Sequence, residues 1–218
     1  LTGLSDLTIT QGATEALTIV AEASIMPYIK SVVQDGNLTI GFDKADWPRV
    51  PQPTQPIQFT LMLKKLDALT LAGQGNIEAA NLKTPTLKLS LGGQGAIRIA
   101  NLEANDLACT VTGHGDIRMP SLKAVRSGCV IAGQGNLALA GQLTSQEITI
   151  TGRGDYQAGN LDSQTAKVAL DGAGNVTLWV RKRLEIEVFG KGSVAYYGNP
   201  LVIQNGLGAA DVHSLGNK

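Results

Sequence analysis

Gly73-Gln-Gly75-Asn-Ile77 and Gly93-Gln-Gly95-Ala-Ile97 are two copies of a pattern that returns about every twenty residues along this chain. Each copy is a Gly-x-Gly pair that follows an alternating apolar run. The seven pairs are Gly73 and Gly75, Gly93 and Gly95, Gly113 and Gly115, Gly133 and Gly135, Gly152 and Gly154, Gly172 and Gly174, and Gly190 and Gly192, at successive spacings of 20, 20, 20, 19, 20 and 18 residues. A nearly constant period in this range is typical of a solenoid, in which one supersecondary unit stacks on copies of itself.

Three apolar columns keep a fixed position relative to the glycine pairs, and the residues between them are mostly small or polar. Because this alternation has a period of two, it indicates short strands that are buried on one face. The columns are Leu69, Leu89, Cys109, Cys129, Ile148, Val168 and Ile186; Leu71, Leu91, Val111, Ile131, Ile150, Leu170 and Val188; and Ile77, Ile97, Ile117, Leu137, Tyr156, Val176 and Val194. The glycines are expected at corners, where a residue without Cβ can take positive φ and let the chain change sheet.

A second corner is marked by a polar residue followed by leucine, as in Asn81-Leu82, Asn101-Leu102, Ser121-Leu122 and Asn160-Leu161. Asparagine tolerates the left-handed region and can bond its own copy on the next rung, so a stacked column is expected here. Strong β-formers alternate with glycine, and no stripe with a period of 3.6 residues appears. The sequence therefore predicts an all-β fold, a right-handed parallel β-helix with rungs of about twenty residues.

Composition narrows the class of protein. The chain has 218 residues, 26 glycines, 4% aromatic residues and a formal net charge of zero. Scarce aromatics and no basic excess argue against nucleic-acid binding. No apolar run approaches the ~20 residues of a membrane span. Because Leu1 is not an initiator methionine, we expect a mature chain whose secretion signal is absent from this sequence, and hence a periplasmic, outer-surface or extracellular protein.

The first 56 residues lack the Gly-x-Gly corner. We expect strands at 7–9, 17–19 and 38–40, a short helix or irregular arm over 25–33, and a turn at Asp35-Gly36. A stretch with Pro48, Pro51, Pro53 and Pro56 follows and cannot belong to a central strand. The predicted organisation is an N-terminal cap or irregular first rungs over 1–56, a repeat body over 57–206 and a polar C-terminal tail over 207–218.

The order of these segments resembles the head GIN domain family of autotransporter adhesins. The resemblance rests on Asp35-Gly36-Asn-Leu38-Thr-Ile40, on Leu66-Asp-Ala-Leu69 before the repeated units, and on the closing Gly192-Ser-Val194-Ala-Tyr196-Tyr-Gly198-Asn-Pro200. It covers nearly the whole chain. It implies bacterial secretion, a β-helical fold and an adhesin role in the cell envelope, and it brings no catalytic residues with it.

Several local motifs have a functional interpretation that competes with a structural one. The Gly-x-Gly pairs lack the third glycine and the helix of a dinucleotide fingerprint, so we interpret them as corners. Gly113-His-Gly115-Asp116 resembles a calcium nonapeptide, but its column carries too little charge and has twice the required period. His114 and His213 lack neighbours at ligand spacing, and Arg153-Gly154-Asp155 is interpreted as a turn rather than an integrin-binding tripeptide. We assign no cofactor and no metal.

The outward columns separate a binding module from an enzyme. A β-helical polysaccharide lyase or hydrolase, the alternative function, needs carboxylates or a base clustered across neighbouring rungs. The column five residues after the first glycine reads Glu78, Arg98, Arg118, Ala138, Gln157, Thr177 and Ala195. Arg98 and Arg118 are the candidate ligand-binding residues, able to hold an anionic glycan or to pair with Glu78 and Glu103. The sequence thus favours a non-enzymatic adhesin-like module whose partner is a cell-surface glycan or protein, and it leaves a homo-oligomer open.

Cys109 and Cys129 occupy the same inward column on consecutive rungs. We expect their Cα atoms to lie about 4.8 Å apart. Parallel side chains fit the torsion of a disulfide poorly, and buried thiols also serve as small apolar residues. We therefore predict two free thiols.

Overall fold

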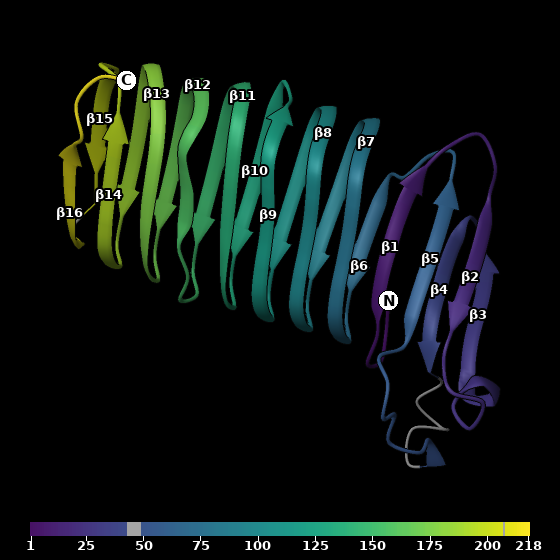
Figure 1. The fold of residues 1–218 in the computed structure, drawn as a ribbon. Helices are drawn as coiled ribbons and strands as arrows, with labels where there is room; N and C mark the ends of the chain where they lie inside the picture. Colours follow the sequence, from purple (N-terminus) through teal and green to yellow (C-terminus); the bar gives the residue numbers. More distant parts are fainter. Residues whose placement is uncertain (43–48, 207) are drawn as a thin grey trace.

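The computed structural model describes residues 1–42, 49–206 and 208–218, and it confirms the predicted parallel solenoid. Figure 1 shows the rungs stacked along one axis from the N-terminal to the C-terminal end. A 14-stranded sheet runs through the body, and a separate two-stranded sheet lies at the N-terminal end. The strands are β1 (Asp6–Gln11), β2 (Ala16–Val20), β3 (Ile29–Gln34), β4 (Asn37–Phe42), β5 (Gln58–Leu63), β6 (Ala68–Leu71), β7 (Gln74–Leu91), β8 (Gln94–Val111), β9 (His114–Lys123), β10 (Arg126–Ile131), β11 (Gln134–Ile150), β12 (Tyr156–Leu170), β13 (Ala173–Val188), β14 (Lys191–Tyr197), β15 (Leu201–Asn205) and β16 (Ala209–Ser214).

Equivalent residues of successive rungs pair in parallel register, as the near-constant repeat length requires. Ile77 pairs with Ile97, and Ile97 pairs with Ile117. The register shifts once between β9 and β11, once between β11 and β12, and twice between β12 and β13. These irregularities lie beside the corners, so the inward columns stay aligned on either side of them.

Each rung has three corners, one more than the sequence analysis identified. Inward and outward residues alternate along β7, but two consecutive residues face outward at Ala80-Asn81 and again at Pro85-Thr86. The same interruption recurs at Ala100-Asn101 in β8. Since a strand can expose two successive side chains only where it bends, these positions mark corners. The third corner is at the glycine pair, where one strand ends and the next begins.

The core is the stack of inward columns. All three predicted columns are buried along their whole length. Tyr156 replaces an aliphatic residue in one of them and brings a polar group inside. Its hydroxyl donates to Gln146 Oε1 at 2.9 Å, and Gln146 Nε2 donates to Ser163 Oγ at 2.8 Å. Burial raises the pKa of the Tyr156 hydroxyl well above its usual value, so this side chain stays neutral and its hydrogen bond offsets the desolvation of the phenol.

The glycine corners are set mainly by close approach rather than by positive φ. A Cβ at Gly93 would lie 1.8 Å from the carbonyl oxygen of Gly73, and a Cβ at Gly115 would lie 1.9 Å from that of Gly95. Equivalent contacts repeat at the other pairs, through Gly190 and Gly192. The positive φ expected from sequence occurs, among the fourteen corner glycines, at Gly75, Gly95 and Gly192. The stacked carbonyls, by contrast, exclude a side chain at every one.

The second glycine of a pair is mostly the second residue of the strand that begins at the corner. Gly135 is the second residue of β11 and Gly174 the second residue of β13. Neither has positive φ, so the expected reason for glycine does not hold there. A Cβ at Gly135 would instead lie 2.0 Å from Gly115 O, and a Cβ at Gly174 would lie 2.1 Å from Gly154 O. Gly135 and Gly174 are therefore strand residues that must be glycine because the preceding rung lies so close.

Two further corners that lack one glycine lie at the ends of the repeat. Residues 3–7 form the equivalent corner on the rung before Gly73, because a Cβ at Gly73 would meet Gly3 O at 2.2 Å and Leu7 pairs with Ile77. At the other end, β16 pairs with β14 with Asp211 beside Ser193. Residues 207–218, assigned from sequence to a polar tail, thus include a strand that continues the solenoid, while Leu207 lies outside the described residues.

The N-terminal segment is woven into the end of the body. β1 lies between β5 and β7 and pairs with both in parallel, and β2 closes that edge with antiparallel pairing to β5. The predicted strands at 7–9, 17–19 and 38–40 lie in β1, β2 and β4. The arm at 25–33 forms a 3-10 helix (Met26–Tyr28) and β3, which joins β4 through the turn at Asp35-Gly36. Pro51, Pro53 and Pro56 lie outside the strands, and Pro48 lies outside the described residues.

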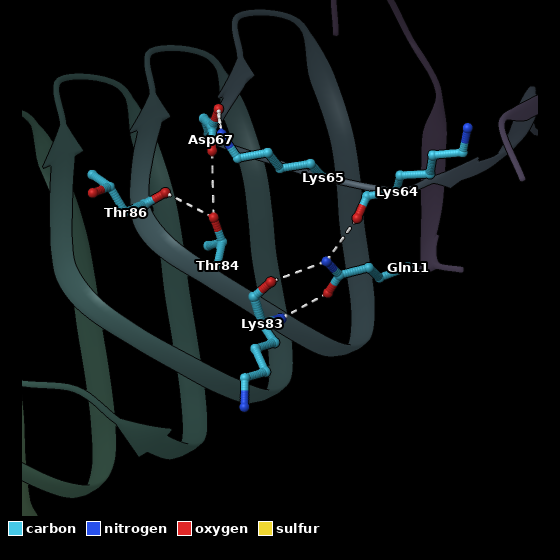
Figure 2. A network of polar contacts seen from close by, with 7 residues as sticks. All are labelled: Gln11, Lys64, Lys65, Asp67, Lys83, Thr84 and Thr86. Carbon is cyan, nitrogen blue, oxygen red and sulfur yellow. Dashed lines mark hydrogen bonds and ion pairs between the residues drawn. The ribbon is translucent and has the colours of Figure 1, made fainter. Parts of the chain in front are cut away.

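Gln11 ties this segment to the first full rung (Figure 2). Its Nε2 donates to the carbonyl oxygens of Lys64 and Lys83, both at 3.0 Å. Its Oε1 accepts from Lys83 N at 2.7 Å. The side chain amide thus takes the place of a backbone pair at the point where β1 ends.

Candidate binding groove

The outward column that contains the two arginines lines a groove with a volume of 830 Å³. Register pairs join its members from Thr8 in β1 to Thr177 in β13, through Glu78, Arg98, Arg118, Ala138 and Gln157. The groove also includes the column two residues further along each rung: Ala80, Ala100, Pro120, Ala140 and Gly159. With about 4.8 Å between rungs, six steps from β1 to β13 give a groove on the order of 29 Å long.

The groove forms because a column of small residues lies beside a column of mostly longer ones. Ala80 and Ala100 place only a methyl group at the bend before the Asn81 corner, and Pro120 and Gly159 continue this low floor. The neighbouring column has the longer side chains of Glu78, Arg98, Arg118 and Gln157, which form one wall. The floor is apolar and the wall is polar, which is the composition of a site that binds an amphipathic chain.

Both arginines take part in ion pairs on the groove wall. Arg98 Nη1 lies 3.4 Å from Glu78 Oε1 on the preceding rung, one of the pairings left open from sequence. Arg118 Nη2 lies 2.8 Å from Asp116 Oδ2 on its own strand. The other anticipated partner, Glu103, instead bonds Lys83 at 2.9 Å, and Lys83 lowers the pKa of that carboxyl. The arginine side chains remain about half exposed, so they stay accessible to a ligand.

Two aromatic side chains lie close to the C-terminal end of the groove. Trp179 and Tyr197 pair in register, and Trp179 pairs with Asp162 across the register shift that follows Ala158. A Cβ at Gly159 would lie 3.2 Å from the Tyr197 ring, so the ring rests directly on the groove floor. Arg181 lies over the Trp179 ring at 5.5 Å and is held by Asp162 through two hydrogen bonds. The sequence analysis did not select these residues, because a lone Trp and Tyr in different rungs carry no signal until the register is known.

The residues after the second glycine of each pair form a hydrogen-bonded ladder. This ladder includes the aspartates of the calcium-like and integrin-like motifs. Asp116 Oδ1 accepts from Asn136 N at 3.3 Å and Nδ2 at 3.1 Å, and Asp155 Oδ1 accepts from Asn175 N at 2.8 Å. These carboxylates are therefore engaged within the solenoid, including the aspartate of Arg153-Gly154-Asp155. The ladder predicted at the second corner is present between Asn101 Nδ2 and Asn81 Oδ1 at 2.9 Å.

The two histidines considered as metal ligands also have positions explained by the solenoid. His213 Nδ1 lies 3.0 Å from Asp211 Oδ2, and His114 lies in the column between the corner glycines. Across residues 1–42, 49–206 and 208–218 no group of three or more His, Cys, Asp or Glu side chains could hold a metal ion. Over the same residues no helix has the length and apolarity needed to cross a membrane.

Cys109 and Cys129 pair in register, and both are buried free thiols. A hydrogen bond between the two thiols and burial raise the pKa of Cys109 well above its usual value. A thiol in this environment stays protonated and behaves as a small apolar residue.

The stacked parallel rungs define a β-solenoid that carries a long groove along one side. The chain belongs to the family described as "Putative auto-transporter adhesin, head GIN domain", which matches residues 1–200. The predicted family is thereby confirmed. Its name associates the family with adhesion at the cell surface.

Solved structures share the fold. A putative adhesin from Parabacteroides merdae is 22% identical with a TM-score of 0.86, and the match covers 98% of this chain and 89% of that one. A putative lipid binding protein from Parabacteroides distasonis is 16% identical with a TM-score of 0.83, covering 98% and 89%. A putative adhesin from Bacteroides fragilis is 20% identical with a TM-score of 0.71, covering 100% and 89%. No curated protein matches the sequence.

Proposed function

We propose that this protein is a non-enzymatic adhesin-like module of the cell envelope, acting in the periplasm, on the outer surface or outside the cell, that binds a linear cell-surface glycan in its groove. The observation that carries the proposal is the groove itself, which follows the solenoid axis from β1 to β13 with an apolar floor and a polar wall. A site of this length fits an extended polymer better than a small metabolite. Its family associates such chains with adhesion.

Arg98 and Arg118 are proposed to hold acidic groups of the glycan. They are register partners, so their guanidinium groups stand on adjacent rungs at a spacing of about 4.8 Å. Arg98 is already paired with the exposed Glu78 and Arg118 with the partly buried Asp116, and ion pairs at a protein surface contribute only about 0–1 kcal/mol. A carboxylate or sulfate of the ligand can therefore replace Glu78 or Asp116 at little cost and gain charge-assisted hydrogen bonds.

The groove wall lacks the arrangement that glycan cleavage requires. Glu78 bonds Arg98, and Asp116 bonds Arg118 while it also accepts from the Asn136 backbone. Neither carboxylate is enclosed by apolar side chains, as the acid catalyst of a glycan-cleaving enzyme is. Binding without turnover is thus the function that these side chains support best.

The test is attachment of the Arg98→Ala/Arg118→Ala variant to a panel of immobilised acidic and neutral polysaccharides. We expect the variant to lose at least about tenfold in affinity for acidic polymers, and we expect wild-type binding to weaken as salt rises. The matched control is Lys88→Ala/Lys167→Ala, which removes two exposed cations from another side of the solenoid. Attachment that is indifferent to the arginines would place the binding surface elsewhere, and release of new reducing ends would contradict the non-enzymatic function.

A further inference from the structure

The aromatic end of the groove already holds an ammonium group, that of Lys218 in the same chain. Lys218 Nζ lies 4.5 Å from the centre of the Tyr197 ring and 5.5 Å from that of Trp179. It donates hydrogen bonds to Gly159 O and Asn160 Oδ1. Two ring faces and two oxygen acceptors around one nitrogen make a site suited to a primary ammonium ion.

This site is continuous with the groove. Gly159 and Asn160 line the groove and also bind the ammonium, and the Tyr197 ring lies against Gly159. A ligand that follows the floor from Ala80 toward the C-terminal end therefore reaches the two rings as its next contact. The Lys218 side chain covers both rings, and Arg181 also lies over the Trp179 ring.

The segment that carries Lys218 is held by few interactions. Leu215 N donates to Tyr196 O at 2.7 Å, and Gly198 N donates to Gly216 O at 2.9 Å. Residues 215–218 belong to no strand and are exposed. Such a segment can leave its position while β16 remains paired with β14, because few backbone bonds must break.

We propose that Trp179, Tyr197, Gly159 and Asn160 form a subsite for the protonated amine of an amino sugar, and that Lys218 occupies this subsite until the glycan displaces it. This inference rests on the proposed function and names one part of its ligand. An amino sugar satisfies both halves of the site, since its ammonium replaces Lys218 Nζ and its apolar ring face stacks on an aromatic side chain. The wall column runs three rungs from β9 to β13, so one polysaccharide with acidic and amino sugars can contact both the arginines and this subsite.

A tethered lysine competes with any free ligand at an effective concentration in the millimolar range. If Lys218 holds the subsite more than about nine-tenths of the time, removing it raises the apparent affinity of the amino sugar at least about tenfold. Lys218→Ala opens the site, whereas Lys218→Arg keeps a cation over the rings and is the matched control.

The experiment follows Trp179 fluorescence in a Trp47→Phe background, where Trp179 is the single tryptophan. The probes are a glucosamine oligomer and the N-acetylated oligomer of the same length, at a mildly acidic pH that keeps the free amines protonated. We expect saturable binding of the glucosamine oligomer to Lys218→Ala, at least about tenfold tighter than to wild type or Lys218→Arg. The N-acetylated oligomer should show no such gain, and Tyr197→Leu in the Lys218→Ala background should abolish it.

A second measurement keeps the proposal testable in the unaltered chain, should Lys218→Ala not fold. In wild type, the ring currents of Trp179 and Tyr197 should shift the NMR resonances of the Lys218 ε-methylene group, and the glucosamine oligomer should move them toward those of an exposed lysine. Equal binding of both oligomers, or unchanged Lys218 resonances, would overturn the proposal. Binding of a lysine-containing peptide without binding of the glucosamine oligomer would also overturn it and would assign the subsite to a protein partner. Because neither oligomer is acidic, these results are independent of the arginine test, and either proposal can fail alone.

Discussion

Single residues at the corners decide how closely the rungs can stack. Gly115 shows the effect of contact alone, because its φ lies outside the left-handed region while its missing Cβ would meet Gly95 O at 1.9 Å. An alanine there must push two backbones apart. We expect Gly115→Ala to destabilise the protein by about 3 kcal/mol or more, measured from the urea midpoint.

Gly128 in β10 is the matched control for that substitution. It is exposed, and nothing lies within 4 Å of an added Cβ. Gly128→Ala should be neutral or should stabilise by about 0.4–1 kcal/mol through the unfolded chain. Similar losses at Gly115 and Gly128 would mean that glycine is needed for flexibility rather than for close packing.

Cys109 should make the free energy of unfolding decrease at alkaline pH. Its pKa is raised in the folded protein by the hydrogen bond with Cys129 and by burial, so the folded state keeps a proton that the unfolded thiol loses above about pH 8.5. The stabilisation is complete below that pH and is lost as the pH rises toward the folded pKa. The predicted slope is about −1.4 kcal/mol per pH unit.

Urea unfolding at a series of pH values from about 8 to about 10 measures this slope. Cys109→Val should flatten it with little loss of stability at neutral pH, because the thiol packs as a small apolar group. The denatured protein without reductant should also present two reactive thiols. A single reactive thiol or none would show that a disulfide forms and would remove the basis of the pH prediction.

The residue columns were readable from sequence because each position has one environment repeated seven times. Ser5 shows where this reasoning stops. It stands at the second glycine position of the first corner, since a Cβ at Gly75 would lie 1.9 Å from Ser5 O. The close contacts of each corner are with the preceding rung, and no full corner precedes Ser5, so a side chain is tolerated there. The end rungs therefore lack the complete Gly-x-Gly pair by which the other rungs were recognised in the sequence.

At the scale of elements, the N-terminal segment closes one end of the solenoid. An open end would leave strand edges and apolar columns unpaired, and β2 and β5 cover that end beside β1. We propose that residues 1–56 act as the cap of the repeat body. Sequence analysis could not place β1 between β5 and β7, because pairing across some fifty residues leaves no periodic trace in the chain.

Gln11 is the most direct test of how the cap is joined (Figure 2). Gln11→Ala removes three hydrogen bonds to Lys64 and Lys83. We expect a loss of about 1–3 kcal/mol in the free energy of unfolding, since each bond contributes about 0.5–1.5 kcal/mol and all three are partly exposed to water.

The control is Gln34→Ala, at an exposed glutamine of β3. Hydrogen exchange should report faster opening of β1, β2 and β5 in Gln11→Ala than in Gln34→Ala. Uniform acceleration along the whole solenoid would mean that cap and body open as one cooperative unit.

At the scale of the whole molecule, the groove arises from a regularity that no single rung reveals. The wall column was predicted residue by residue, and its register pairs bear that out. The floor was not predicted, since Ala80, Ala100, Pro120 and Ala140 carry no chemistry of their own. Their importance is that they are small at one corner on successive rungs, and that corner is visible only once the bend of each strand is known.

If the ligand lies in the groove, a bulky side chain on the groove floor should reduce binding even though it removes no contact residue. Ala100 lies on the floor beside Arg98 and is exposed, so Ala100→Trp should fold normally and fill the groove next to that arginine. We expect attachment to the polysaccharides that bind wild type to fall at least about tenfold while the melting temperature shifts little. Ala108→Trp, an equally exposed substitution on another side of the same rung, should leave attachment unchanged. If the two variants bind alike, the ligand does not follow the groove, and the polar wall acts only as an ordinary solvated surface.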